Sequence, residues 1–140
     1  MVFLTKSNRY LEMTEKLLAS GTRGRILATS NVTSKGKEFD YVVNREPLLE
    51  RDEQIIDNSF LMLLKVLKSA GIRDVYCAGL DGYSDREDNY FNPKMEYSFV
   101  KTEAIRMNRH IKGVIEDMRK DMNISFITYS HYEEKQKDED

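Results

Sequence analysis

The chain has 140 residues, with 22 basic and 24 acidic side chains and a formal net charge of −2. This length suits one domain with a real hydrophobic core and excludes a multidomain machine. The hydrophobic fraction of 40% and the charged fraction of 33% are typical of a chain that folds. The near balance of charge argues against nucleic acid as a partner. No apolar run approaches the roughly 18 residues of a membrane span. No membrane partner is therefore expected, and the chain is interpreted as cytoplasmic.

Residues that commonly carry metal or thiol chemistry are scarce. The chain contains one cysteine, Cys77, and two histidines, His110 and His131. A single cysteine can form neither an internal disulfide nor a cysteine-rich metal site, so no metal is expected. The sequence contains no GxGxxG, GKS or GKT motif, which counts against a nicotinamide cofactor and against Walker-type hydrolysis. No cofactor is expected in this domain. An unidentified nucleotide or phosphorylated compound is compatible with the sequence as a ligand.

Short apolar runs and helical spacings alternate along the chain. The expected strands are apolar runs bounded by polar or glycine residues, and they cover residues 2–5, 25–29, 39–43, 74–79 and 124–129. The expected helices carry apolar residues three and four positions apart, and they cover residues 10–18, 60–70 and 104–122. Pro47 leaves residues 44–56 open between a loop and a short helix.

This alternation predicts an α/β fold. We expect a single Rossmann-like three-layer sandwich with a mainly parallel sheet of about five strands. The domain is expected to occupy residues 1–132. In residues 133–140 five acidic side chains stand against two basic ones, which is typical of a charged, disordered tail. Because the chain starts directly on a strand, it is interpreted as one part of a longer protein.

Ligands of open parallel sheets bind beyond the carboxyl ends of the strands. After the first strand, Ser7, Asn8 and Arg9 offer a hydroxyl, an amide and a guanidinium where a helix begins, which would suit a phosphate or carboxylate. Capping of that helix by Ser7 or Asn8 explains the same residues. Ser30 and Asn31 follow the second strand at the same sheet edge.

Two later segments are also expected at the edge of the sheet where ligands bind. Asn58 and Ser59 precede the central helix, where capping is favoured over ligand binding. After the fourth strand, Asp81 offers an acceptor, Gly82 permits close backbone approach and Tyr83 can stack or donate. A structural turn held by Asp81 is the alternative. The candidates for a general base are Asp81 and His131. The expected ligand-binding residues are thus Ser7, Asn8, Arg9, Ser30, Asn31, Asn58, Ser59, Asp81, Gly82 and Tyr83.

Three segments carry a resemblance to a known family. Residues 57–65 (DNSFLMLLK), 71–84 (GIRDVYCAGLDGYS) and 89–91 (NYF) together resemble the C-terminal domain of bacterial 4-hydroxy-2-oxovalerate aldolase-like proteins, which are HMG-CoA-lyase-like aldolases. The resemblance implies an accessory domain. The lyase chemistry would then belong to an N-terminal aldolase barrel, which 140 residues could not hold in addition.

A second, shorter resemblance leads to different functions. The pair Asn58-Ser59, followed by a strand that ends in Gly-Leu-Asp-Gly-Tyr, is similar to the CMP-binding half of bacterial sialyltransferases. It implies a nucleotide near Asn8, Asn31, Ser59, Asp81 and Tyr83, although residues 81–97 contain no histidine for catalysis. The functions to be distinguished are an accessory domain that binds a small molecule, a sugar-nucleotide transferase or hydrolase, and a structural dimerisation module that forms a homo-oligomer.

Overall fold

A computed structural model describes residues 1–7, 16, 21, 24–32, 39–52, 55–83 and 98–133, with side chains from residue 104 onward in the last range. The chain divides into two compact units, Met1–Val66 and Leu67–Asp140. We call them the N-terminal unit and the C-terminal unit and describe each by itself.

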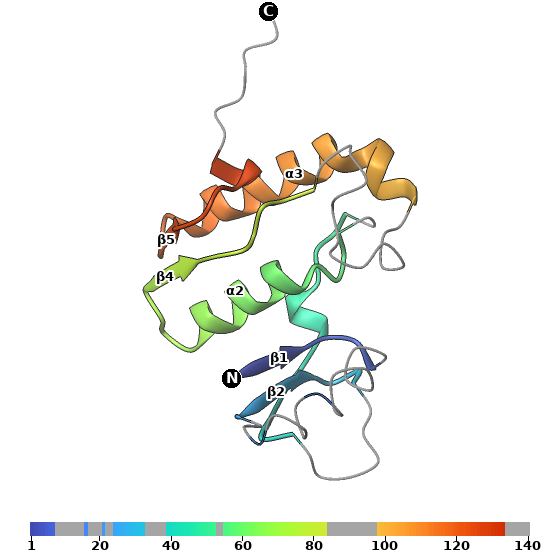
Figure 1. Cartoon of the computed structure of the whole chain (residues 1–140). Coiled ribbons are helices and arrows are strands. Elements are labelled where there is room, and N and C mark those ends of the chain that lie inside the picture. Colours follow the sequence, from blue (N-terminus) through green and yellow to red (C-terminus); the bar gives the residue numbers. More distant parts are fainter. Residues whose placement is uncertain are drawn as a thin grey trace, which may run out of the picture. The chain divides into compact units, whose positions relative to one another are not determined.

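The N-terminal unit contains a three-stranded parallel sheet. Its strands are β1 (Val2–Leu4), β2 (Ile26–Thr29) and β3 (Tyr41–Val43), in the order β1-β2-β3. Figure 1 shows β1 and β2 side by side. All four residues of β2 are buried, as expected for a central strand covered on both faces. The surrounding core consists of Leu4, Ile26, Ala28 and Val32, with Val2 and Phe39 partly buried against it.

A short 3-10 helix and a longer α-helix follow this sheet. The 3-10 helix η1 (Glu46–Leu48) has Pro47 in its first turn, where a missing N–H costs nothing. The helix α2 (Ser59–Ser69) buries Leu61, Met62 and Leu64. It ends where the sequence predicts, because the N–H of Gly71 donates to Lys68 O and that of Ile72 to Leu67 O, with Gly71 at a φ of 80°. This pair of bonds is the glycine-dependent C-terminal cap of a helix.

The C-terminal unit contains a parallel pair of strands joined through a long helix. The strands are β4 (Asp74–Cys77) and β5 (Asn123–Phe126), and the helix is α3 (Ser98–Met118). The chain ends its described part in a second 3-10 helix, η3 (His131–Glu133), which contacts α3. Figure 1 shows β4 beside β5, with α3 and η3 nearby. The predicted apolar stripe of the helix is buried at Ala104, Met107, Ile111, Ile115, Met118 and Met122.

The expected Rossmann-like sandwich with one five-stranded sheet is wrong. The described residues form two separate parallel sheets, of three and two strands, together with two α-helices. The positions of the five expected strands are confirmed within one to three residues at their ends. Apolar runs report that a segment is extended, whereas the choice of neighbouring strand depends on contacts between residues far apart in the sequence. The sequence pattern therefore predicts where the strands lie, but it does not predict which strands pair to form a sheet.

Several expectations lie outside the described residues. The expected helix at 10–18 is described only at Lys16, and the polar connection after Tyr83 is not described up to residue 97. Of the expected tail, Glu133 belongs to η3 and residues 134–140 lie outside. Within the ranges that are described, no helix is both long and apolar enough to cross a membrane.

Candidate ligand-binding site

Hydroxyl and amide side chains gather in the N-terminal unit where β1 and β2 end and α2 begins. The hydroxyl oxygens of Thr5 and Ser59 lie 2.6 Å apart, so one of them donates to the other. Thr5 directly follows β1, and Ser59 is the first residue of α2. We call this group the sheet-end cluster; it consists of Thr5, Thr29, Asn31, Asn58 and Ser59.

Asn31 fastens the ends of the two strands to each other. Its Nδ2 donates to the carbonyl of Thr5 at 2.9 Å, and its Oδ1 accepts from the hydroxyl of Thr29 at 2.5 Å. The Thr29 side chain is fully buried, and its hydroxyl also lies 3.5 Å from Leu4 O. Because buried polar groups need partners, this set of bonds fixes the exposed Asn31 in one orientation. Asn31, which was expected to bind a ligand, therefore also has a structural role, because it holds the ends of β1 and β2 together.

Asn58 caps α2, which is the alternative favoured from the sequence. Its Oδ1 accepts from the N–H of Leu61 at 3.1 Å, and its carbonyl accepts from the N–H of Met62 at 3.0 Å. This is the usual way for an asparagine to satisfy the first turn of a helix. The hydroxyl of Ser59, which is exposed, extends instead to Thr5.

Two cationic residues lie at the same edge of the sheet. Lys6 continues from β1, and its Nζ is 3.8 Å from Asp57 Oδ2, with both side chains about two-fifths exposed (41% and 39%). Arg45 follows β3, and its backbone N–H donates to the hydroxyl of Ser30 at 3.1 Å. Among the residues that the structure describes, the Nε of Arg45 is buried and has no hydrogen-bond partner. A buried guanidinium N–H of this kind needs an acceptor, and anionic oxygens are the acceptors that it prefers.

The segment after β4 forms a structural turn in the C-terminal unit. The carbonyl of Asp81 accepts from the N–H of His131 at 2.7 Å. The N–H of Tyr83 donates to Asn108 Oδ1 at 2.8 Å, and Asn108 Nδ2 donates back to Tyr83 O at 2.5 Å. Gly82 has a φ of 93°, and a Cβ there would lie 3.1 Å from the Cβ of His131. These contacts match the alternative in which the segment holds a turn.

The two candidates for a general base, Asp81 and His131, are neighbours in this turn. His131 is brought to Asp81 by the main-chain bond, and its Nδ1 lies 3.2 Å from the hydroxyl of Tyr129. The two rings meet edge to face, with centroids 5.2 Å apart. If the tyrosine donates, the neutral imidazole carries its proton on Nε2, which leaves a donor and not a base on that side.

The remaining expected residues are placed as follows. Ser7 is half-buried just after β1, whereas Asn8 and Arg9 lie outside the described residues. Ser30 is exposed and binds the backbone of Arg45. In the ranges that the structure describes, no three His, Cys, Asp or Glu side chains lie close enough together to hold a metal ion.

Four residues that organise these sites are not among those expected from the sequence. Thr5 and Thr29 both close an apolar run (VFLT and ILAT), and this shared ending was a signal that could have been used. Arg45 and Asn108 gave no signal, because the first stands in an unreadable stretch and the second is a polar residue on an amphipathic helix.

In comparisons with known proteins, no protein-family model, no curated protein and no solved structure matches the chain.

Proposed function

We propose that the chain is an accessory domain that binds a phosphorylated or nucleotide-type small molecule at the sheet-end cluster. In this proposal it serves a 4-hydroxy-2-oxovalerate aldolase-like enzyme whose lyase chemistry resides in an N-terminal barrel. The proposal rests on the resemblance carried by residues 57–65, 71–84 and 89–91. The domain itself supplies binding and no reaction.

The observation that carries the binding proposal is the contact between Thr5 and Ser59. It joins the carboxyl end of β1 to the first turn of α2, an 11-residue helix whose N-terminus favours negative charge. Exposed hydroxyl and amide groups of Ser59 and Asn31 stand beside this position, with the ammonium of Lys6 on the adjoining residue. Phosphate oxygens are recognised by this combination of a cation, hydroxyls and a helix terminus.

The unpartnered Nε of Arg45 supports an anionic ligand independently. Leaving a buried donor unsatisfied costs about 1–3 kcal/mol, a cost that a ligand oxygen would remove. Because β1, β2 and β3 are parallel, Arg45 follows β3 at the edge where Thr5 follows β1. The geometry near Asp81 gives less support to the transferase alternative, since Gly82 and the Asp81 carbonyl are occupied in holding a turn.

The proposal also places the protein in the cytoplasm. Its single cysteine, Cys77, is a buried free thiol, which suits a reducing compartment.

Ligand-induced stabilisation tests the binding proposal. We expect the melting temperature to rise with one or more of CMP, CDP, UDP, CoA, phosphosugars and inorganic phosphate, since ligand at 100 times its Kd adds about 2.7 kcal/mol. Cytidine without a phosphate should give no rise if the phosphate is what the site recognises. A response to CMP but not to phosphosugars would identify a nucleotide site, and the reverse would identify a phosphosugar site.

Matched variants locate the site. Lys6→Met and Ser59→Ala should abolish the rise, whereas Ser125→Ala, an exposed serine of the C-terminal unit, should leave it unchanged. A folded wild-type chain that responds to none of these compounds would contradict the proposal, as would a response that persists in both Lys6→Met and Ser59→Ala.

A further inference from the structure

The strand β5 has an edge that faces away from β4. The N–H of Asn123 donates to Arg73 O at 2.7 Å, and the N–H of Ile127 donates to Cys77 O at 2.9 Å. Main-chain groups alternate between the two edges of a strand, so the carbonyl of Ile124 faces the edge opposite β4. In the described part of the chain no further strand pairs with that edge. Open edges of this kind are templates on which another strand can add.

The sequence around β5 is well suited to such addition. Residues 123–130 (NISFITYS) contain no charged residue, no glycine and no proline, and are rich in β-branched and aromatic side chains. Uncharged segments of this composition are the ones that pair with copies of themselves. The side chains of Ile127 and Tyr129 are 68% and 61% exposed. The unit thus carries a self-complementary segment at its surface.

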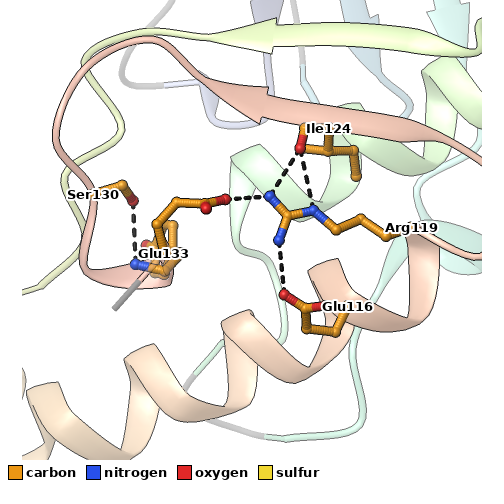
Figure 2. A network of polar contacts seen from close by, with 6 residues as sticks. Glu116, Arg119, Ile124, Ser130 and Glu133 are labelled. Carbon is orange, nitrogen blue, oxygen red and sulfur yellow. Dashed lines mark hydrogen bonds and ion pairs between the residues drawn. The ribbon is translucent and has the colours of Figure 1, made fainter. Parts of the chain in front are cut away.

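Arg119 occupies the open edge of β5. Its Nε and Nη2 both donate to the carbonyl of Ile124, at 3.1 Å and 2.8 Å. Figure 2 shows the guanidinium lying between this carbonyl and the carboxylates of Glu116 and Glu133, with each of which it forms an ion pair. The guanidinium carbon also lies 6.0 Å from the centre of the Phe126 ring. An added strand would need the carbonyl of Ile124 as a hydrogen-bond acceptor, and this carbonyl already accepts two bonds from Arg119.

Glu133 fastens the end of η3 to the same guanidinium. The preceding residue, Tyr132, is buried, and its ring centre lies 6.1 Å from that of Phe126. Burial lowers the pKa of Arg119, but hydrogen bonds and charge from Glu133 and Glu116 outweigh it and raise the pKa overall. The guanidinium thus stays charged, and its ion pair with Glu133 holds η3 alongside β5.

We propose that Arg119 and Glu133 form a latch that closes the β5 edge, and that opening the latch lets the β5 strand of a second copy of this chain add to it. A second copy is the expected occupant because the segment is uncharged, so two copies meet without repulsion. Two identical edges pair antiparallel about a two-fold axis, with the same residues on both sides. With the axis at Ser125, the middle of residues 123–127, each Ser125 faces its counterpart.

The test compares the molar mass of the whole chain and its variants by light scattering over a range of concentrations. Arg119→Met removes the donors and keeps the aliphatic stem, and it should raise the molar mass about twofold relative to wild type. Lys120→Met is the matched control, because Lys120 is the adjacent cation, is 76% exposed and pairs with Asp117, three residues earlier on the chain, at 2.9 Å. It should leave the molar mass unchanged.

A second substitution separates strand pairing from general misfolding. Adding Ser125→Lys to Arg119→Met should restore the wild-type molar mass, because like charges placed directly opposite each other destabilise a strand pair. If Arg119→Met does not fold, Arg119→Lys is measured instead, since it keeps a positive charge beside Glu116 and Glu133 but cannot make the paired Nε and Nη2 bonds to Ile124 O.

Each result decides the proposal. A folded Arg119→Met chain, or in its place a folded Arg119→Lys chain, with the wild-type molar mass overturns it. So does a larger species that Ser125→Lys fails to dissociate, because association would then run through another surface. A larger species that Ser125→Lys dissociates, with Lys120→Met unchanged, supports the latch.

Discussion

The ammonium of Lys65 on α2 lies 2.7 Å from a carboxylate oxygen of Glu50 and also donates to the carbonyls of Leu48 and Leu49, at 3.1 Å and 3.3 Å. The two charged side chains are only 25% and 15% exposed. All three N–H donors of one lysine are therefore used to fasten the segment after η1 to the helix. This contact ties the segment that follows η1 to α2.

Replacing Lys65 with methionine should destabilise the N-terminal unit by about 1–3 kcal/mol. The substitution keeps the apolar stem but removes the ammonium that pairs with the Glu50 carboxylate and donates to two main-chain carbonyls. Urea unfolding at pH 7, followed by circular dichroism, measures the change.

Lys68 on the same helix provides the control. It pairs with Asp121 at 3.0 Å, but both side chains are about half exposed (47% and 53%), so Lys68→Met should cost no more than about 1 kcal/mol. Equal losses for the two methionine variants would show that the partly buried position of Lys65 contributes nothing beyond an ordinary surface pair.

Gly82→Ala should destabilise the turn after β4 by about 1–3 kcal/mol. Gly82 has a φ of 93°, and an added Cβ would lie 3.1–3.3 Å from atoms of His131, Asn108 and Tyr132. Both the backbone conformation and the space available therefore oppose a side chain. Thermal unfolding of the variant measures the loss.

Gly113→Ala is the opposite case on α3. An added Cβ meets nothing within 4 Å there, and alanine favours a helix interior over glycine by about 0.8–1.0 kcal/mol. The variant should thus be more stable than wild type. A Gly82→Ala protein as stable as Gly113→Ala would contradict the packing of the turn against η3.

Asn31→Ala should cost about 1–3 kcal/mol, because it removes the 2.5 Å acceptor of the buried Thr29 hydroxyl, which keeps a long contact of 3.5 Å to Leu4 O, and also removes the amide that donates to the carbonyl of Thr5. Asn44→Ala serves as the comparison, since its amide makes one long contact of 3.4 Å to the N–H of Glu46. Chemical unfolding of both variants should show a clear loss for Asn31 and a change within about 0.5 kcal/mol for Asn44. A small loss of stability in Asn31→Ala would mean that water replaces the hydrogen bonds of Asn31 to Thr29 and Thr5.

Local signals in the sequence predicted the elements well and their assembly poorly. Gly71 marks the end of α2 because the cap involves only the N–H groups of Gly71 and Ile72 and two preceding carbonyls, all within six residues of the chain. The stripe from Ala104 to Met122 predicts the buried face of α3 for the same reason, since helical spacing is local. The expected single sheet failed because the pairing of strands depends on residues that are distant in sequence.

The candidate site residues show the same difference between local contacts, which the sequence predicts, and distant contacts, which it does not. Asn58 and Ser59 could be placed at a helix start from their order alone, and Asn58 indeed caps α2. Arg119 could not be assigned, because its partners Ile124 and Glu133 are brought to it only by the turn after α3 and the return of η3. Nothing in the sequence distinguishes it from Lys120, which is exposed.

The thiol of Cys77 should react slowly and should make stability depend on alkaline pH. Burial raises the pKa of this thiol above its usual value of 9.0, and the nearby charge of Arg119 offsets only part of that effect. A raised pKa in the folded state means that the folded chain holds the proton more tightly than the unfolded chain. The resulting stability is fully present below pH 9.0 and is lost as the pH rises through the folded-state pKa. Cys77→Ala should therefore flatten the loss of stability above pH 9.0 that the wild type shows.

The reaction of the native thiol with an aromatic disulfide at pH 8 should also be much slower than that of the urea-unfolded chain. Native and unfolded chains that react at the same rate would show that Cys77 is accessible and would remove the basis for both expectations.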